Sequence, residues 1–140
     1  MSATAGLLSP MTLSRLCRHR SRVFYAGLAV ALLGSILALL IRSDADWWLA
    51  VVFALAPDLG VLDGIAAGPA RGQLHPRAVP LDNALHRFWG PVGLIIVTVA
   101  AGLPRAWLAA GLGWGFHVAF DRAIGLRLRS RDGFKRGDGR

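Results

Sequence analysis

The residue pair with the clearest chemical potential is His117 and Asp121, which stand four positions apart in an otherwise apolar run. Residues i and i+4 stack on one face of a helix, so the imidazole and the carboxylate are expected to point the same way. Together they could bind a divalent metal ion, or form a base oriented by its partner. Alternatively they form a buried hydrogen-bonded pair that fixes helix packing, with Arg122 reaching out to a polar surface beside it. The spacing leaves both interpretations open.

Further polar residues in or beside apolar runs are candidates to complete such a site. Asp58 follows Pro57, so its carboxylate could bind backbone amides that the proline frees, or act as a ligand facing His117. His86 could be a third ligand or a base, or an ordinary solvated histidine near an interface. Asn83, one turn earlier, could support the site or, like its neighbour Asp82, cap a helix. The candidate polar or metal site therefore comprises Asp58, His86, His117 and Asp121, with Asn83 and Arg122 in support.

The composition is typical of a membrane protein. Of 140 residues, 54% are hydrophobic and 17% are charged, and the mean hydropathy is +0.49. The 16 Lys and Arg residues outnumber the 8 acids, giving a net charge of +8. Such a charge could attract nucleic acid, but no recognition motif accompanies it. The basic residues instead stand beside apolar runs, which favours a lipid bilayer with anionic headgroups as the partner and argues against nucleic acid.

The apolar runs predict an all-α bundle of four transmembrane helices, at about 24–41, 47–68, 81–103 and 106–126. The transmembrane domain would then span 23–126. Residues 1–22, which are basic and contain no acid, are predicted to be a disordered leader, and 127–140 a basic tail. Pro57 should kink the second helix, and Pro91 falls in the first turns of the third.

The distribution of basic residues predicts the orientation of this bundle. Four spans place both termini and the loop 69–87 on one side, which carries fourteen Lys and Arg residues against two on the other. By the positive-inside rule both termini are cytoplasmic, in a multi-pass protein of the bacterial inner membrane. The tail residues predicted to lie against anionic headgroups are Arg127, Arg129, Arg131, Lys135 and Arg136.

Several short motifs, in order along the chain, are similar to those of one family. They are Trp47-Trp48, Ala56-Pro57-Asp58, Ala67-Gly68-Pro69, Asn83-x-x-His86, His117-x-x-Phe120-Asp121-Arg122 and Gly133-Phe134-Lys135. In these motifs the chain resembles the domain-of-unknown-function 4260 family of small bacterial integral-membrane proteins. The resemblance implies a small multi-span membrane protein and no particular activity. The family has Asp-Thr-His where this chain has Arg136-Gly137-Asp138, and glycine where it has Asp63, so neither segment is included in the site.

Three functions are compatible with these residues. In the first, Asp58 and His117 bind a divalent metal, His86 is a third ligand or a base, Asp121 orients His117, and the metal activates water for hydrolysis. In the second, the same residues satisfy one another in a non-enzymatic packing or interaction protein. In the third, intramembrane Asp and His side chains relay protons in a small proton-coupled carrier.

Overall fold

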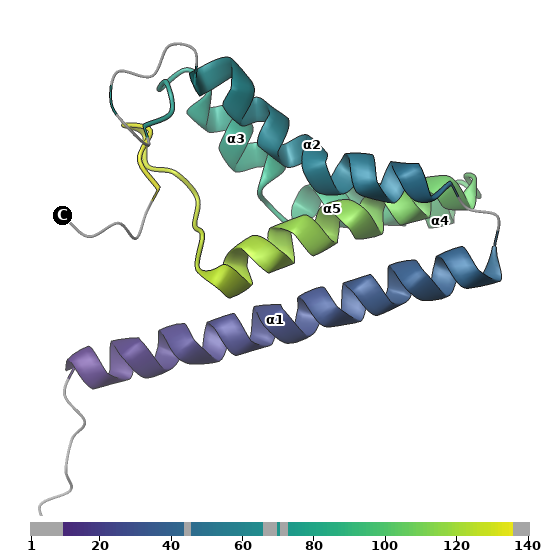
Figure 1. Cartoon of the computed structure of the whole chain (residues 1–140), viewed down its shortest axis with the longest axis horizontal. Coiled ribbons are helices and arrows are strands. Elements are labelled where there is room, and N and C mark those ends of the chain that lie inside the picture. Colours follow the sequence, from purple (N-terminus) through teal and green to yellow (C-terminus); the bar gives the residue numbers. More distant parts are fainter. Residues whose placement is uncertain (1–9, 44–45, 66–69, 71–72, 136–140) are drawn as a thin grey trace, which may run out of the picture.

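The computed structural model describes residues 10–43, 46–65, 70 and 73–135, and within these residues the fold is all-α, as expected. Five helices follow one another along the described chain (Figure 1): α1 (Pro10–Arg42), α2 (Trp47–Ile65), α3 (Val79–Leu85), α4 (Trp89–Ala100) and α5 (Arg105–Ile124). The described part contains no strand and has one isolated antiparallel bridge, between Arg129 and Lys135.

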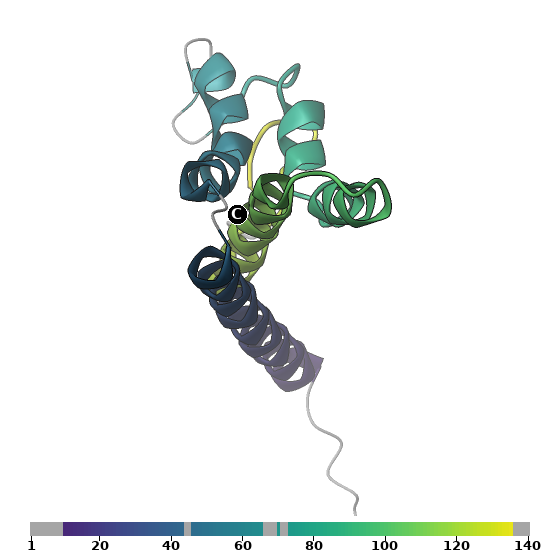
Figure 2. The ribbon, with the colours of Figure 1, turned by 90° about the vertical axis from the view of Figure 1, so that its right-hand side faces the viewer.

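Helix α5 is the centre of the fold, because α1, α2 and α4 all pack against it (Figure 2). Its glycines remove the side chains that would keep these neighbours apart. A Cβ atom on Gly113 would collide with the backbone of Ala50 in α2, and one on Gly111 would lie 2.7 Å from the side chain of Ile95 in α4. Such close approach of helices is what small residues permit.

The buried core lies where α1, α2 and α5 meet. Ile36, Ala50 and Ala109, one from each helix, are buried together there, and the half-buried Leu112 and Phe116 pack against them. The core therefore holds the last third of α1 and the first turn of α2 against α5.

Helix α1 begins well before the apolar run. The predicted disordered leader is helical from Pro10 onwards, and residues 1–9 lie outside the described part of the chain. Proline is well tolerated at a helix start because its missing N–H has no intrahelical partner there. No glycine or further proline interrupts the segment before Gly27, so local propensity lets the helix extend through the basic residues.

One segment of α1, Arg15–Arg42, is long and apolar enough to cross a membrane, judged by length and composition alone. Only 11% of its most apolar window is buried. Two shorter apolar stretches lie in α2 and α4, at Trp47–Leu59 and Trp89–Ala100. On these criteria the described residues contain one candidate span, where hydropathy predicts four.

The predicted third helix, 81–103, is wrong as a single element. Helix α3 ends at Leu85 and α4 begins at Trp89. Pro91 has no N–H to donate to the carbonyl of Arg87, so a helix can contain it comfortably only in its first turn. The chain therefore stops one helix and starts another around the proline.

The break between α3 and α4 leaves two carbonyl groups without the helical donors they would otherwise have. Side chains of α5 supply the missing hydrogen bonds. Trp114 Nε1 donates to the carbonyl of Leu85 at 2.7 Å, and Arg122 Nη2 donates to that of His86 at 2.9 Å. Arg122 therefore reaches into the fold, and its Nη1 also donates to the carbonyl of Leu126 at 2.9 Å.

The segment after α5 folds back onto the rest of the protein. Gly125 ends the helix with a φ of 94°, a left-handed conformation that glycine adopts without strain. The backbone N–H of Leu74 donates to the carbonyl of Gly133 at 3.1 Å, and Gln73 Nε2 donates to that of Asp132 at 2.7 Å. Up to Lys135, the predicted basic tail is thus an ordered part of the structure.

Candidate metal centre

Three helices position the candidate site. Asp58 lies in α2 directly after the buried Pro57, and the later part of α2 bends away from α5 (Figure 1). A proline inside a helix lacks one backbone hydrogen bond, and this accounts for the bend. His86 is the residue at which α3 ends. His117 and Asp121 lie one turn apart in α5.

The structure brings one atom from each of these four residues together. His86 Nε2 lies 3.3 Å from His117 Nε2, 3.5 Å from Asp121 Oδ2 and 3.6 Å from Asp58 Oδ1. His117 Nε2 lies 3.8 Å from both Asp58 Oδ1 and Asp121 Oδ2. The atoms of Asp58, His86 and His117 all lie within 4.8 Å of one another, and the Asp121 oxygen lies beside both histidine nitrogens. We call these four atoms, which come from α2, the end of α3 and α5, the donor cluster.

The separations in the donor cluster fit either a set of ion pairs and hydrogen bonds or a metal site. The two histidine nitrogens are within hydrogen-bond distance, and the Asp–His separations of 3.5–3.8 Å are those of ion pairs rather than direct hydrogen bonds. Metal bonds of about 2.0–2.1 Å at tetrahedral angles would separate donor atoms by roughly 3.3–3.4 Å. The separations among Asp58, His86 and His117, 3.3–3.8 Å, lie close to this value.

The donor cluster is enclosed on three sides and open on the fourth. The side chains of His86, His117 and Asp121 are only 10–11% exposed, whereas that of Asp58 is 62% exposed. Two carboxylates thus approach two imidazoles at a largely buried point. A buried carboxylate is costly without a compensating positive charge. A divalent cation at this point would supply that charge, and it would be reached from the side of Asp58.

A second layer of contacts fixes the orientation of His86. Its Nδ1 lies 2.8 Å from the carbonyl oxygen of Asp82, so the ring donates there and presents the lone pair of Nε2 to the cluster. The Asp82 carboxylate contributes as well, with Oδ1 3.8 Å from the same Nδ1. Its other oxygen lies 3.3 Å from Arg129 Nε. Partners of this kind hold metal-binding histidines in position.

Sequence reasoning missed Asp82 as a site residue and considered it only as a helix cap. A usable signal was present, because Asp82 and His86 have the same four-residue spacing as His117 and Asp121. The helix cap does not form, since the residue before α3 is Ala78 and no side chain caps that end.

Asn83 supports the site indirectly. Its Oδ1 accepts a hydrogen bond of 2.7 Å from the backbone N–H of Arg129, and its Nδ2 donates to the carbonyl of the same residue at 3.0 Å. This pair of bonds holds the segment after α5 beside α3. Asn83 therefore places the Arg129 side chain against Asp82.

The predicted membrane-surface residues do not behave alike. The prediction that Arg129 lies at the membrane surface is wrong, because its side chain is buried. Its Nη1 donates to the carbonyl of Gly133 at 3.0 Å, and its Nε lies beside Asp82. Its burial follows from the acid it meets in α3, a contact between segments far apart in the chain. Arg127 and Arg131 are exposed and Lys135 is half-buried. Arg136 and the side chain of Asp63 lie outside the described residues.

Comparison with known proteins gives one result. No curated protein and no solved structure matches the chain. The sequence profile of the family described as Domain of unknown function (DUF4260) matches residues 26–138, a range that contains the donor cluster together with Asp82 and Arg129. Because this match covers well over half of the chain and agrees with the motifs found in the sequence, the protein belongs to the DUF4260 family.

Proposed function

We propose that the protein is a multi-pass membrane protein that binds one divalent metal ion through Asp58, His86 and His117, with Asp121 beside both histidines, and that the metal activates water for hydrolysis at a fourth, open position. The observation that carries this proposal is the convergence of Asp58, His86 and His117 from three elements, with their ligand atoms 3.3–3.8 Å apart. The group of Asp58, His86 and His117 alone places three ligand atoms within 4.8 Å of one another.

The chemistry of the donors indicates the class of metal. Two imidazole nitrogens and two carboxylate oxygens suit Zn²⁺ and similar divalent transition metals, because these ions accept both kinds of ligand. Neutral imidazoles with two carboxylates also balance the charge of a divalent cation. The orientation of His86 by Asp82 matches this role, since it directs Nε2 toward the other donors.

The open side of the cluster supports water activation. Asp58 is the one exposed donor, so water entering beside it would reach a metal held by Asp58 and the two buried histidines. A divalent metal would lower the pKa of such a water to about 7.

Two features support a membrane location. The apolar window of α1 is almost entirely unburied, which a soluble core helix would not be. Helix α1 also packs along α5, and such a role in the fold favours a permanent helix over a removable signal. Large apolar side chains are exposed on α2 and α4 as well, including Val51, Leu55 and Val99.

The broken third segment is compatible with a span. Helix α4 has 12 residues and is therefore about 18 Å long, which is too short to cross a hydrocarbon core of about 30 Å. We infer that α3 and α4 together form the third crossing. Irregular backbone is tolerated at membrane depth where protein satisfies its polar groups, and α5 does so here through Trp114 and Arg122.

A metal titration of the full-length protein tests the proposal. Protein purified in detergent and stripped by a chelator should bind one Zn²⁺ per chain in isothermal titration calorimetry, and His117→Ala should bind at least about a hundredfold more weakly. His19→Ala is the matched control, because His19 is exposed on α1 outside the cluster. Equal affinity in both variants, or stripped protein that binds no metal and unfolds at an unchanged temperature, would support the packing interpretation instead.

The water-activation step has its own measurement. Protein loaded with Co²⁺ should show an absorption change with a midpoint near pH 7 as the bound water ionises. Asp58→Asn should shift that midpoint downwards, because the metal loses a negatively charged ligand and polarises its water more strongly, whereas Asp132→Asn should leave the midpoint unchanged. A spectrum that does not change with pH would contradict water activation by the metal, but it would not contradict metal binding itself.

A further inference from the structure

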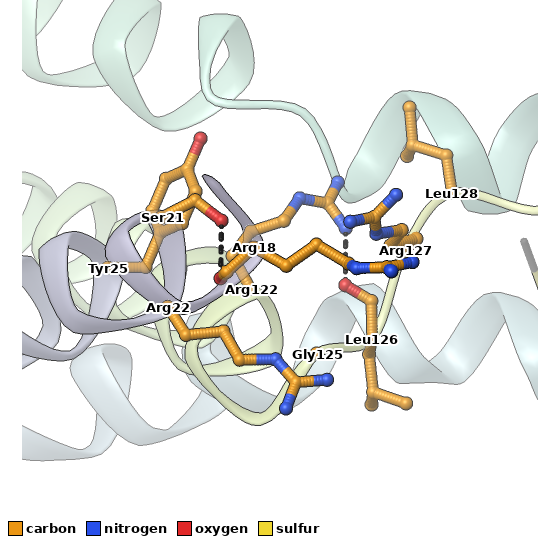
Figure 3. A pocket seen from close by; sticks show the side chains of 9 residues that line it. All are labelled: Arg18, Ser21, Arg22, Tyr25, Arg122, Gly125, Leu126, Arg127 and Leu128. Carbon is orange, nitrogen blue, oxygen red and sulfur yellow. Dashed lines mark hydrogen bonds between the residues drawn. The ribbon is translucent and has the colours of Figure 1, made fainter. Parts of the chain in front are cut away.

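A second polar feature lies between the N-terminal half of α1 and the end of α5. It is a pocket with a volume of about 350 Å³ (Figure 3). Its charged lining among the described residues consists of four arginines, Arg18, Arg22, Arg122 and Arg127, with no acid among them. Four guanidinium groups around one small cavity repel one another unless an anion lies between them.

Both helices contribute a regular pattern to this pocket. Arg18, Arg22 and Tyr25 follow one another at four- and three-residue spacing, so they share one face of α1. The ring of Tyr25 stacks on Phe88 with centroids 5.9 Å apart, which fixes that wall of the pocket. On the other side, the left-handed turn at Gly125 sends the chain back so that Arg127 lies beside α1.

Two of the arginines are held in place by contacts of their own. The guanidinium of Arg22 lies against Gly125, where a Cβ atom would collide with it. Arg122 is held by its hydrogen bonds to the carbonyls of Leu126 and His86. In Figure 3 the guanidinium groups of Arg18, Arg122 and Arg127 lie near one another on one side of the pocket. The positive charge is therefore gathered at a defined place.

The end of α5 adds a partial negative charge beside these arginines, because a helix C-terminus carries roughly half a negative charge. Guanidinium groups present paired N–H donors that match the oxygens of carboxylate and phosphate groups. A phosphate monoester fits several arginines best, because it carries a charge of about −1.5 to −2 and three strong acceptor oxygens. A volume of about 350 Å³ is at the small end of the range of about 300–1,000 Å³ found for ligand pockets.

We propose that this pocket binds a phosphate monoester, supplied either as a lipid headgroup or as a soluble phosphate compound. The ligand would lie between Arg18 and Arg22 of α1 and Arg127 of the returning segment, with Arg122 at its base. This site is separate from the donor cluster and does not rest on the proposed metal chemistry. A phosphate bound here would tie α1 to the end of α5.

Binding of defined phosphate compounds to the full-length protein in an uncharged detergent tests this site. The probes are inorganic phosphate, a short-chain phosphatidic acid and, as the diester control, a short-chain phosphatidylcholine. The first two should bind and the third should bind much more weakly. Phosphatidic acid binding at least tenfold more tightly than inorganic phosphate identifies a lipid headgroup as the ligand, and similar affinities identify a soluble one.

Matched charge-neutralising variants separate the pocket from general basic charge. Arg18→Gln and Arg127→Gln should each weaken binding about tenfold, the usual effect of losing a charge-assisted hydrogen bond. Arg20→Gln and Arg131→Gln remove the same charge from exposed positions outside the pocket and should change the affinity less than twofold. Equal losses in both pairs, or no binding of either phosphate probe, would overturn the proposal. His117→Ala should leave phosphate binding unchanged, so this result and the metal result are independent.

Discussion

The donor cluster and the arginine pocket both use the last turns of α5, yet they handle charge in opposite ways. The cluster places one buried and one exposed carboxylate against two buried imidazoles. The pocket gathers four arginines and lacks an acid among its lining residues. The cluster therefore has the negative groups that a divalent metal ion requires, and the pocket has the positive groups that a phosphate requires.

The two sites also differ in how rigidly they are built. The cluster is held by a second layer that runs from His86 through Asp82 to Arg129, and by the close contact of α2 with α5 at Gly113. The pocket is formed by exposed and half-buried side chains of the N-terminal half of α1 and the end of α5. Metal chemistry requires fixed ligand geometry, whereas phosphate binding tolerates movement of long arginine side chains. Arg122 belongs to both sites, since it lines the pocket and donates to the carbonyl of His86.

The largest expected effect comes from separating α2 from α5. Gly113→Ala places a Cβ against the backbone of Ala50, and overpacking of this kind typically costs about 1–3 kcal/mol. The variant should unfold at a lower temperature in detergent and bind Zn²⁺ weakly, because Asp58 moves away from His117. Phosphate binding should persist, since α1 and α5 form that pocket.

Gly93→Ala is the matched control for this variant. A Cβ at Gly93 in α4 has no atom within 4 Å, so alanine there should raise stability, by up to about 1 kcal/mol through helix propensity. If both alanine variants destabilise the protein equally, the contact at Gly113 does not determine the packing of α2.

The next effect concerns whether the cluster acts as a unit. In metal-free protein, Asp58→Asn and His117→Ala should not be additive, and a double-mutant cycle on thermal or denaturant stability should give a coupling energy of about 0.5–3 kcal/mol. The physical reason is that the two side chains approach to 3.8 Å at a largely buried point. Additive effects would mean that Asp58 is an independent surface carboxylate.

A smaller effect is expected from the second layer. Asp82→Asn should weaken Zn²⁺ binding about tenfold to a hundredfold, as loss of such partners commonly does, because the carboxylate links His86 to Arg129. Calorimetric titration measures this change, and the affinity for phosphate should not alter. Asp132→Asn, at an exposed position in the segment after α5, is the control and should keep the metal affinity of the native protein.

The smallest effect is a pH dependence outside both sites. The pKa of Asp132 lies below its ordinary value of 3.8, mainly because the Ser130 hydroxyl donates to its carboxylate. A lowered folded pKa means that the stabilisation is complete above the ordinary value and is lost as the pH falls through the folded one. Ser130→Ala should flatten the dependence of the unfolding temperature on pH below 4, with only a slight effect because the group is exposed. Unchanged curves would show that this turn does not contribute to acid stability.

Local pattern was sufficient for the helical parts of the structure. Long apolar runs with few helix breakers are typical of helices, so the sequence predicted an all-α fold. The four-residue spacing of His117 and Asp121 places both on one face of α5 by helix geometry alone. Pro57 in the bend of α2 and Pro91 in the first turn of α4 also act through a purely local property, the missing N–H. The division of 81–103 into two helices was not predicted, because a proline marks a weak point without showing whether the helix bends or stops there.

Only the tertiary structure decided which of these residues meet. Arg129 was expected at the membrane surface because its neighbours in sequence are basic, but it is buried beside Asp82. The carbonyls at the break after α3 are satisfied by Trp114 and Arg122, and the pocket arises where the start of α1 meets the end of α5. Residue spacing along a helix reports which face a side chain occupies. The spacing carries no information on which other helix packs against that face. In this protein the packing partner depends on glycine contacts between segments distant in the chain, such as the contact at Gly113.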